Sequence, residues 1–446
     1  MAGSDGRAVF RGVAACGAAA IVLTAAACGG ADARNAGGRD GDPGVARADT
    51  ALRRLVADLL PEMERRSGLP LRRPVRLGVR SREELEAYLT RELGRQLPAD
   101  RVEGMVRVYA RLGLVPDSLR LEPLLRALYL EQVVGYYDPA ADTLFVVEGV
   151  ASQQLEAVLA HEIVHALQDQ YMDIDSVLQA LEEDNDRGTA ARAALEGHAT
   201  YAMLEWQLAQ VTGRDADLRD FPALQEILAD NPLAAAGVDM PVLEKAPAVI
   251  RESLLFPYLG GLAFVQGAWR LEGTKTPPLA DRLPESTEQV LHPERYVSAD
   301  RDAPEAVRFL GPPPAGWSEV ATDDLGEFEI RLFLREHTGR PEEAKEAAAG
   351  WDGDRYRLLD GPGGEALVWV SLWDTESDAE DFAARARQAL AARYAASGGE
   401  DAAGRRTRVE LRNADGRSAV LLLDAPAGPG VGALDEAARF RVESPE

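Results

Sequence analysis

Two histidines and a glutamate at helical spacing are the first residues of this sequence that could do chemistry. The stretch "LEAVLAHEIVHALQDQY" carries His161 and His165 four residues apart, with Glu162 directly after the first histidine. Residues four apart lie on one face of a helix, so both imidazoles can reach one metal ion, and zinc suits such ligands. Glu162 would then project toward the open coordination position, where a carboxylate can take a proton from a metal-activated water. The motif predicts a catalytic zinc site.

A catalytic zinc ion usually has three protein ligands and a water, so a third ligand is needed. Glu196 in "LEGHAT" is the best candidate, because it lies in the next strongly helical segment, 189–210. His198 is its rival, but residues two apart on a helix point in nearly opposite directions, so only one of the two can face the metal. A purely structural site would need a fourth protein ligand, and His198 or Asp169 is available for that role.

Other polar residues could assist the same centre. Asp169 and Asp173 follow on nearly the same helix face and could hold a ligand imidazole, or simply form the exposed polar end of the helix. The oxyanion of a tetrahedral intermediate needs a donor, for which His292, Tyr258 and Tyr296 are candidates. His292 in "LHPERY" is the first choice as a catalytic residue, since a histidine beside proline at a helix end suits a core poorly.

Helical patterns dominate the part of the chain that must position these residues. The motif lies in an apolar helical stripe over 153–171, directly after a predicted hairpin over 133–149. A short strand is expected at 74–80, and Ser81 with Glu84 forms a capping box. Further helices are expected over 51–68, 82–97, 99–112, 119–133, 189–210, 241–255 and 260–271.

The pattern changes beyond Trp317. Helices are expected over 324–335, 341–349 and 379–394, with hairpins over 355–373 and 408–423. The fold class is therefore predicted as α+β: a mostly helical body over 50–310, with a short hairpin before the motif helix, and a smaller α+β module over 317–446.

The N-terminus is typical of an exported protein. Arg7 and Arg11 precede an apolar, small-residue run that ends at Cys28, which resembles a bacterial lipobox. The resemblance implies a signal peptide over 1–28, lipidation of Cys28 and attachment to the outer face of the membrane. Ala25 departs from the usual leucine, which leaves simple secretion open. A flexible tether over 29–49 follows, and since Cys16 and Cys28 are the two cysteines of the chain, the mature fold has neither a disulfide nor a thiolate ligand.

The charge balance restricts the partners. Acidic residues outnumber basic ones by 74 to 49, giving a formal net charge of −25. Phosphate groups repel such a surface, so nucleic acid and anionic membrane surfaces are not expected as partners.

The two motifs together resemble the gluzincin class of zinc metallopeptidases, in which H-E-x-x-H on one helix is followed by a glutamate in an E-G-x-A setting. The wider context, with "VLAHEIVHALQDQ", "GYYDP" and "PESTEQVLHPERY", is similar to a group of bacterial and archaeal predicted metallopeptidases over residues 75–296. The resemblance implies a zincin-like fold with one zinc ion held by His161, His165 and Glu196, and Glu162 as general base. It also implies that strand 143–147 is an edge strand along which an extended polypeptide lies.

The expected function is that of a membrane-anchored, extracytoplasmic zinc peptidase that hydrolyses a peptide or protein substrate. Two alternatives remain open. The first is a catalytically silent zincin-fold lipoprotein that binds a partner or an envelope component, although such a protein has no use for Glu162. The second is a structural zinc site closed by four protein ligands.

Overall fold

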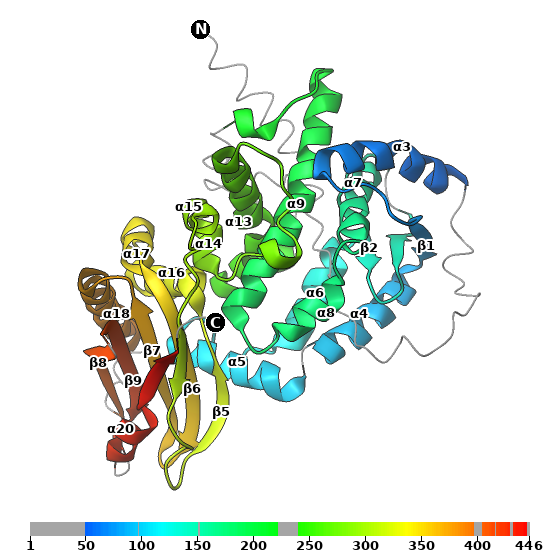
Figure 1. Ribbon diagram of the computed structural model, residues 1–446. Helices are drawn as coiled ribbons and strands as arrows, with labels where there is room; N and C mark the ends of the chain where they lie inside the picture. The colour runs from blue at the N-terminus through cyan, green and yellow to red at the C-terminus, as the bar shows by residue number, and fades with distance from the viewer. Residues whose placement is uncertain are drawn as a thin grey trace.

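The structure is a computed structural model that describes residues 50–96, 98–149, 152–221, 240–396, 404–414, 416–428 and 431–443. The predicted signal peptide with Cys28 and the predicted tether over 29–49 lie outside the described residues. Figure 1 shows a mostly helical body, coloured blue to green, beside a C-terminal sheet with its own helices, coloured yellow to red. The mixed α+β class predicted from the sequence is confirmed.

The helical body begins with α3 and is built around the helices that carry the two motifs. Its longer helices are α3 (Thr50–Ser67), α4 (Arg82–Gln96), α5 (Ala99–Leu112), α6 (Leu121–Gln132), α7 (Ser152–Gln168), α9 (Asn185–Thr212) and α13 (Ala248–Glu272). Its shorter ones are α8 (Ile174–Ala180), α12 (Pro241–Lys245), α14 (Thr287–Leu291) and α15 (Pro293–Val297), with 3-10 turns η2 (Leu218–Asp220) and η3 (Ala280–Arg282).

Local sequence signals explain where several of these helices begin. The predicted capping box is confirmed, because Ser81 N donates to Glu84 Oε2 at 2.8 Å and Glu84 N donates to Ser81 Oγ at 3.2 Å. The prediction of helices over 241–255 and 260–271 is wrong in its break point. The break falls at Pro247, which caps α13, and α13 then continues through Pro257 to Glu272.

The small sheet of the body corrects the prediction of an edge strand at 143–147. Strands β1 (Arg76–Arg80), β2 (Gly135–Asp138) and β3 (Thr143–Val147) form a sheet in the order β1-β3-β2. β3 is central, because it pairs in parallel with β1 on one side and antiparallel with β2 on the other. The edge strand that packs on the motif helix α7 is therefore β2.

Glycine explains the tight contact between α9 and α13 behind the motif. A Cβ atom added at Gly197 would lie 2.0 Å from the carbonyl carbon of Gly261, and one added at Gly261 would lie 1.9 Å from Ala193 O. The two backbones can approach this closely only because neither glycine has a side chain. The second residue of "EGHA" is thus a packing residue, which fixes the helix that carries Glu196 against the buried helix α13.

The C-terminal part forms a five-stranded antiparallel sheet in the order β5-β6-β7-β9-β8. Its elements are β5 (Ser318–Asp323), α16 (Gly326–Thr338), α17 (Pro341–Ala348), β6 (Trp351–Gly361), β7 (Gly364–Trp373), α18 (Glu376–Ala396), β8 (Arg405–Ala414) and β9 (Arg417–Pro426). Both predicted hairpins, β6–β7 and β8–β9, are confirmed. Helices α16 and α18 pack on the sheet, while its other apolar cluster is shared with β4 (Ala306–Phe309), β10 (Phe440–Glu443) and α20 (Leu434–Ala437), which follows the 3-10 turn η4 (Val431–Ala433).

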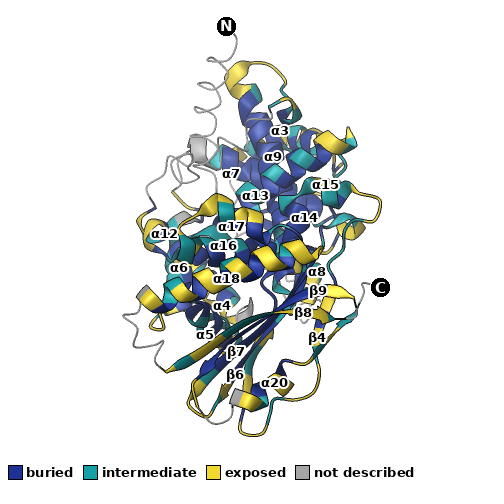
Figure 2. Cartoon of the chain, turned by 90° about the vertical axis from the view of Figure 1, so that its left-hand side faces the viewer, coloured by how far each residue is buried: buried dark blue, intermediate teal, exposed yellow. Residues whose placement is uncertain are grey.

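The helical body and the C-terminal part share one hydrophobic core. Phe256 of α13 stacks on Phe328 of α16 with ring centroids 4.0 Å apart, and the same apolar cluster continues to Trp369 of β7. Figure 2 shows that α9 and α13 are largely buried, whereas α18 exposes its outer face. Among the described residues, α13 is the one helix long and apolar enough to cross a membrane, but half of its apolar window is buried inside the protein.

Candidate metal centre

The predicted ligands lie on two buried helices that pack against each other. Leu159, Ile163 and Leu167 of α7 are fully buried and fix the helix in the core. The opposite side of α7 carries His161 and His165, and α7 packs against α9. His161, Glu162, His165 and Glu196 are each at most 5% exposed.

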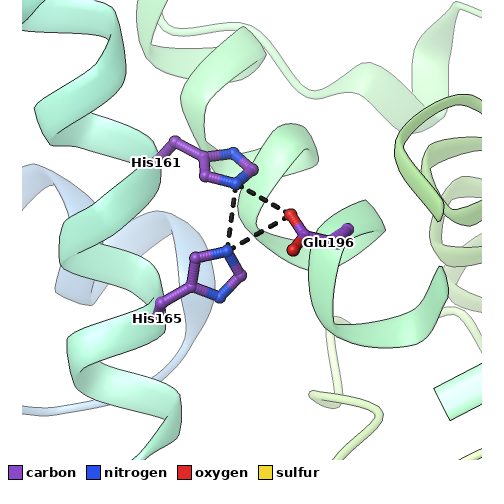
Figure 3. A group of neighbouring side chains, drawn as sticks. All are labelled: His161, His165 and Glu196. Carbon is purple, nitrogen blue, oxygen red and sulfur yellow. Dashed lines mark hydrogen bonds and ion pairs between the residues drawn. The ribbon is translucent and has the colours of Figure 1, made fainter. Parts of the chain in front are cut away.

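Three nitrogen and oxygen atoms from these helices converge on one point (Figure 3). His161 Nε2 lies 3.0 Å from His165 Nε2 and 3.0 Å from Glu196 Oε2, and His165 Nε2 lies 3.3 Å from the same oxygen. Two ligand atoms about 2.1 Å from a tetrahedral ion lie roughly 3.4 Å apart. The three side chains therefore fit a metal ion after moving by a few tenths of an ångström, and together they form the one such group among the described residues.

A chain of hydrogen bonds behind His165 sets which of its nitrogens faces the metal position. His198 Nε2 donates to Ser67 O at 2.9 Å, and burial lowers the pKa of His198 to about 4, so its Nδ1 carries no proton. Gln168 Nε2 donates to that Nδ1 at 3.1 Å and to Leu195 O. Gln168 Oε1 must then accept from His165 Nδ1, 2.7 Å away, which leaves Nε2 of a neutral His165 free to bind metal.

The same chain of hydrogen bonds distinguishes Glu196 from His198 as the candidate third ligand. His198 is engaged on both ring nitrogens away from the metal position, so the structure brings Glu196 and not His198 to the two histidines. The imidazole acceptor expected at Asp169 or Asp173 is instead Gln168. Asp169 Oδ2 accepts from the Tyr137 hydroxyl at 2.9 Å, and Asp173 caps α8 by accepting from Ser176 N.

Without a metal ion, a proton on one of the two histidines balances the negative charge of Glu196. Burial opposes charge on every group, but the Glu196 carboxylate outweighs it at His165 and raises the pKa of that ring to about 9. The histidines in turn lower the pKa of Glu196 to about 2 against the effect of burial. Burial lowers the pKa of His161, so one of the two rings carries the charge. A divalent cation would displace that proton, as metal ions do at histidine sites.

Glu162 lies beside this group and is held by the edge of the small sheet. Tyr137 N of β2 donates to Glu162 Oε2 at 2.7 Å, while Oε1 has no hydrogen-bond partner. Full burial raises the pKa of Glu162 to about 8. This pKa belongs to the metal-free protein, and a divalent cation at the three ligand atoms would lower it, which favours the carboxylate form that accepts a proton.

A small cavity connects Glu162 with two of the ligands. It holds about one water molecule and is lined by Tyr137, Pro139, Glu162, His165, Ile174, Leu178, Arg192, Leu195 and Glu196. Ile174 and Leu178 come from α8, which covers the cavity on that side. The predicted reacting groups thus meet at a space of the right size for an attacking water.

The oxyanion candidates are placed differently from one another. The ring centroid of Tyr258 lies 6.0 Å from that of His161, so Tyr258 is adjacent to the metal position. The Tyr296 hydroxyl donates to Arg282 O at 2.7 Å. His292 Nε2 lies 3.1 Å from Glu327 Oε1 and 3.0 Å from Arg331 Nη2, both on α16, and its Nδ1 lies 3.7 Å from Glu294 Oε1 of α15. The catalytic role of His292 stays a prediction.

Gln168 was missed from the sequence, although its position three residues after His165, on the same helix face, is a usable signal. We expect Gln168→Ala to weaken zinc binding by roughly 10- to 100-fold, because His165 loses the acceptor that fixes its ring. Competition with a chromophoric chelator measures the affinity. Gln179→Ala, at an exposed position of α8, is the matched control and should bind zinc as the unaltered protein does. Equal affinities for the two variants would show that Gln168 does not orient the ligand.

Comparison with known proteins gives one family match, which lies outside the candidate metal centre. Residues 314–436 match the model of a family described as Domain of unknown function (DUF8575). No curated protein and no solved structure matches the chain. The match spans the C-terminal sheet and its helices, and it contains none of His161, His165 and Glu196.

Proposed function

We propose that this protein is a zinc-dependent peptidase, with His161, His165 and Glu196 as metal ligands and Glu162 as general base. The observation that carries the proposal is the convergence of the three ligand atoms beside a carboxylate whose Oε1 has no partner. Two imidazoles and one carboxylate with an open position are a ligand set that catalytic zinc takes. The residues present therefore fit the ion that the gluzincin resemblance implies.

In this proposal, a bound zinc ion would polarise the substrate carbonyl and make the attacking water more acidic. Glu162 Oε1 accepts the proton of that water, and the neutral carboxyl group then passes it to the leaving amine. Tyr137 N holds the other carboxylate oxygen, so the base keeps one orientation during both transfers. Gln168 holds His165, and Tyr258 stands next to His161 as the candidate donor to the oxyanion.

The proposed location rests on the sequence. We infer an extracytoplasmic protein attached to the membrane by a lipid on Cys28, with simple secretion as the alternative. Cys28→Ser should move the protein from the membrane fraction to the soluble fraction. Unchanged fractionation would rule out the anchor.

A second candidate function is a metal-containing binding protein without activity. The burial of the site supports this second function. His161, Glu162, His165 and Glu196 are at most 5% exposed, and the cavity beside them holds about one water molecule. A polypeptide can reach Glu162 only if an element such as α8 moves. The binding protein needs no such movement.

A cleavage assay separates the two functions. The chain starting at Gly29, loaded with zinc, is incubated with a diverse peptide mixture, and the products are identified by mass spectrometry. The peptidase proposal expects new termini that disappear after chelation and return when zinc is added back. A zinc-loaded protein that cleaves nothing in the mixture would contradict the proposal and favour the binding protein.

A further inference from the structure

A second, larger cavity lies between the helical body and the C-terminal sheet. Its volume is about 510 Å³, within the range of small-molecule sites. The body contributes α5 and the segment before α9, and the C-terminal part contributes β5, α16 and β6. Asn185, which lines the cavity, is eleven residues from Glu196 on α9, a separation of roughly 16 Å along the helix. The cavity is therefore distinct from the metal centre.

A buried carboxylate with one unsatisfied oxygen lines this cavity. Glu329 of α16 is 5% exposed. Its Oε1 accepts from the Tyr109 hydroxyl at 2.6 Å and from Asn185 Nδ2 at 3.2 Å, but its Oε2 has no hydrogen-bond partner. Leaving a buried carboxylate oxygen without a donor costs free energy, which a donor on a ligand would recover.

The cavity is acidic, and its two arginines are already engaged. Five acidic residues line it, against Arg101 and Arg355. Arg101 lies 3.9 Å from both Glu182 and Asp323, and Arg355 lies 3.5 Å from Asp324. No arginine or lysine is paired with Glu329 among the described residues. The excess negative charge favours a cation as the ligand.

The geometry favours an organic cation over a metal ion. Within the described part of the chain, no three acidic or histidine side chains here bring ligand atoms close enough to hold an ion. Tyr109 and Tyr356 line the cavity, and aromatic side chains attract ammonium and guanidinium groups. Burial raises the pKa of Glu329 to about 7, because it disfavours the charged carboxylate. A cation beside Glu329 would stabilise that charged form.

We propose that this cavity binds a primary ammonium or guanidinium group, with the charged end against Glu329 and the alkyl chain along the two tyrosines. The group can belong to a lysine or arginine side chain of a polypeptide or to a free alkylamine. Neither source requires the metal centre to be catalytic, so the proposal stands independently of the peptidase activity.

Calorimetric titration of the full-length chain in detergent tests the proposal. The probes are Nα-acetyl-lysine methylamide, Nα-acetyl-arginine methylamide and agmatine, with Nα-acetyl-norleucine methylamide as the uncharged analogue. We expect saturable binding of at least one cationic probe, at least ~10-fold weaker binding in Glu329→Gln, and none for the norleucine compound. Tighter binding of a capped amino acid identifies a polypeptide as the source, whereas tighter binding of agmatine identifies a free amine.

Two further variants keep the test decisive. Glu336→Gln removes the same charge from an exposed position of α16 and should leave probe binding unchanged. Thr322→Trp adds bulk at an exposed position of β5 that lines the cavity and should also weaken binding, which covers the case that Glu329→Gln does not fold. The absence of saturable binding by any cation, or equal binding by Glu329→Gln, Thr322→Trp and the unaltered protein, would overturn the proposal.

Discussion

Glu162→Gln is expected to abolish peptide hydrolysis while the protein keeps its zinc. The amide preserves the size of the side chain and its carbonyl oxygen can still accept from Tyr137 N, which donates to Glu162 Oε2 at 2.7 Å. An amide cannot take the proton of the attacking water, so the rate should fall by roughly 10²- to 10⁴-fold, the usual contribution of a general base. Initial cleavage rates and the zinc content of both proteins are the measurements.

The matched control is Glu156→Gln, a half-buried position on the same helix. This variant loses the same charge from α7 without touching the cavity at Glu162, and it should cleave at the normal rate. If Glu162→Gln kept most of the activity, the base would be a different residue. If it lost its zinc, Glu162 would belong to the metal site and not to the proton transfer.

Gly197→Ala should be among the most destabilising single substitutions in the chain. The new methyl group would lie 2.0 Å from the Gly261 carbonyl carbon, and this neighbour is backbone that cannot rotate away. Overpacking of a core commonly costs about 1–3 kcal/mol, and a backbone collision should reach or exceed about 3 kcal/mol. Since Glu196 precedes the glycine, zinc affinity should fall with stability. Denaturant unfolding and chelator competition measure the two effects.

Gly94→Ala supplies the comparison for this prediction. Gly94 lies inside helix α4, and a Cβ atom there would meet nothing within 4 Å. The same substitution should therefore raise the free energy of unfolding slightly, by about 0.5–1 kcal/mol, because alanine loses less backbone entropy in a helix. Equal stabilities for Gly197→Ala and Gly94→Ala would contradict the close crossing of α9 and α13.

The ligand candidates were predictable because helix periodicity places the two histidines on one face, and a third ligand was sought on the next strongly helical segment. His161 and His165 share a face at any position along a helix, and Glu196 lies on the next strongly helical segment. The capping box at Ser81 and both C-terminal hairpins follow from equally local rules, and all three are present. Local patterns therefore account for most of the elements and for the three ligand candidates.

Long-range pairing explains what the sequence did not reveal. The hairpin pattern joins β2 to β3, but it does not show that β1, far away in the chain, adds to the free side of β3 and makes it central. The contact of Tyr137 N with Glu162 depends on that sheet and on its packing against α7, so no local sequence pattern predicts it. The packing role of Gly197 in "EGHA" could not be predicted for the same reason, because it depends on Gly261, which lies far away in the sequence on another helix.

The most direct test of the account is the zinc content of the chain starting at Gly29, measured by elemental analysis after chelator-free purification, beside the His165→Ala variant. The account predicts about one zinc ion per chain in the unaltered protein and loss of the ion in the variant, because one of three ligands is removed. Absence of zinc from the unaltered protein, or an equal content in His165→Ala, would contradict the metal centre and with it the proposed peptidase.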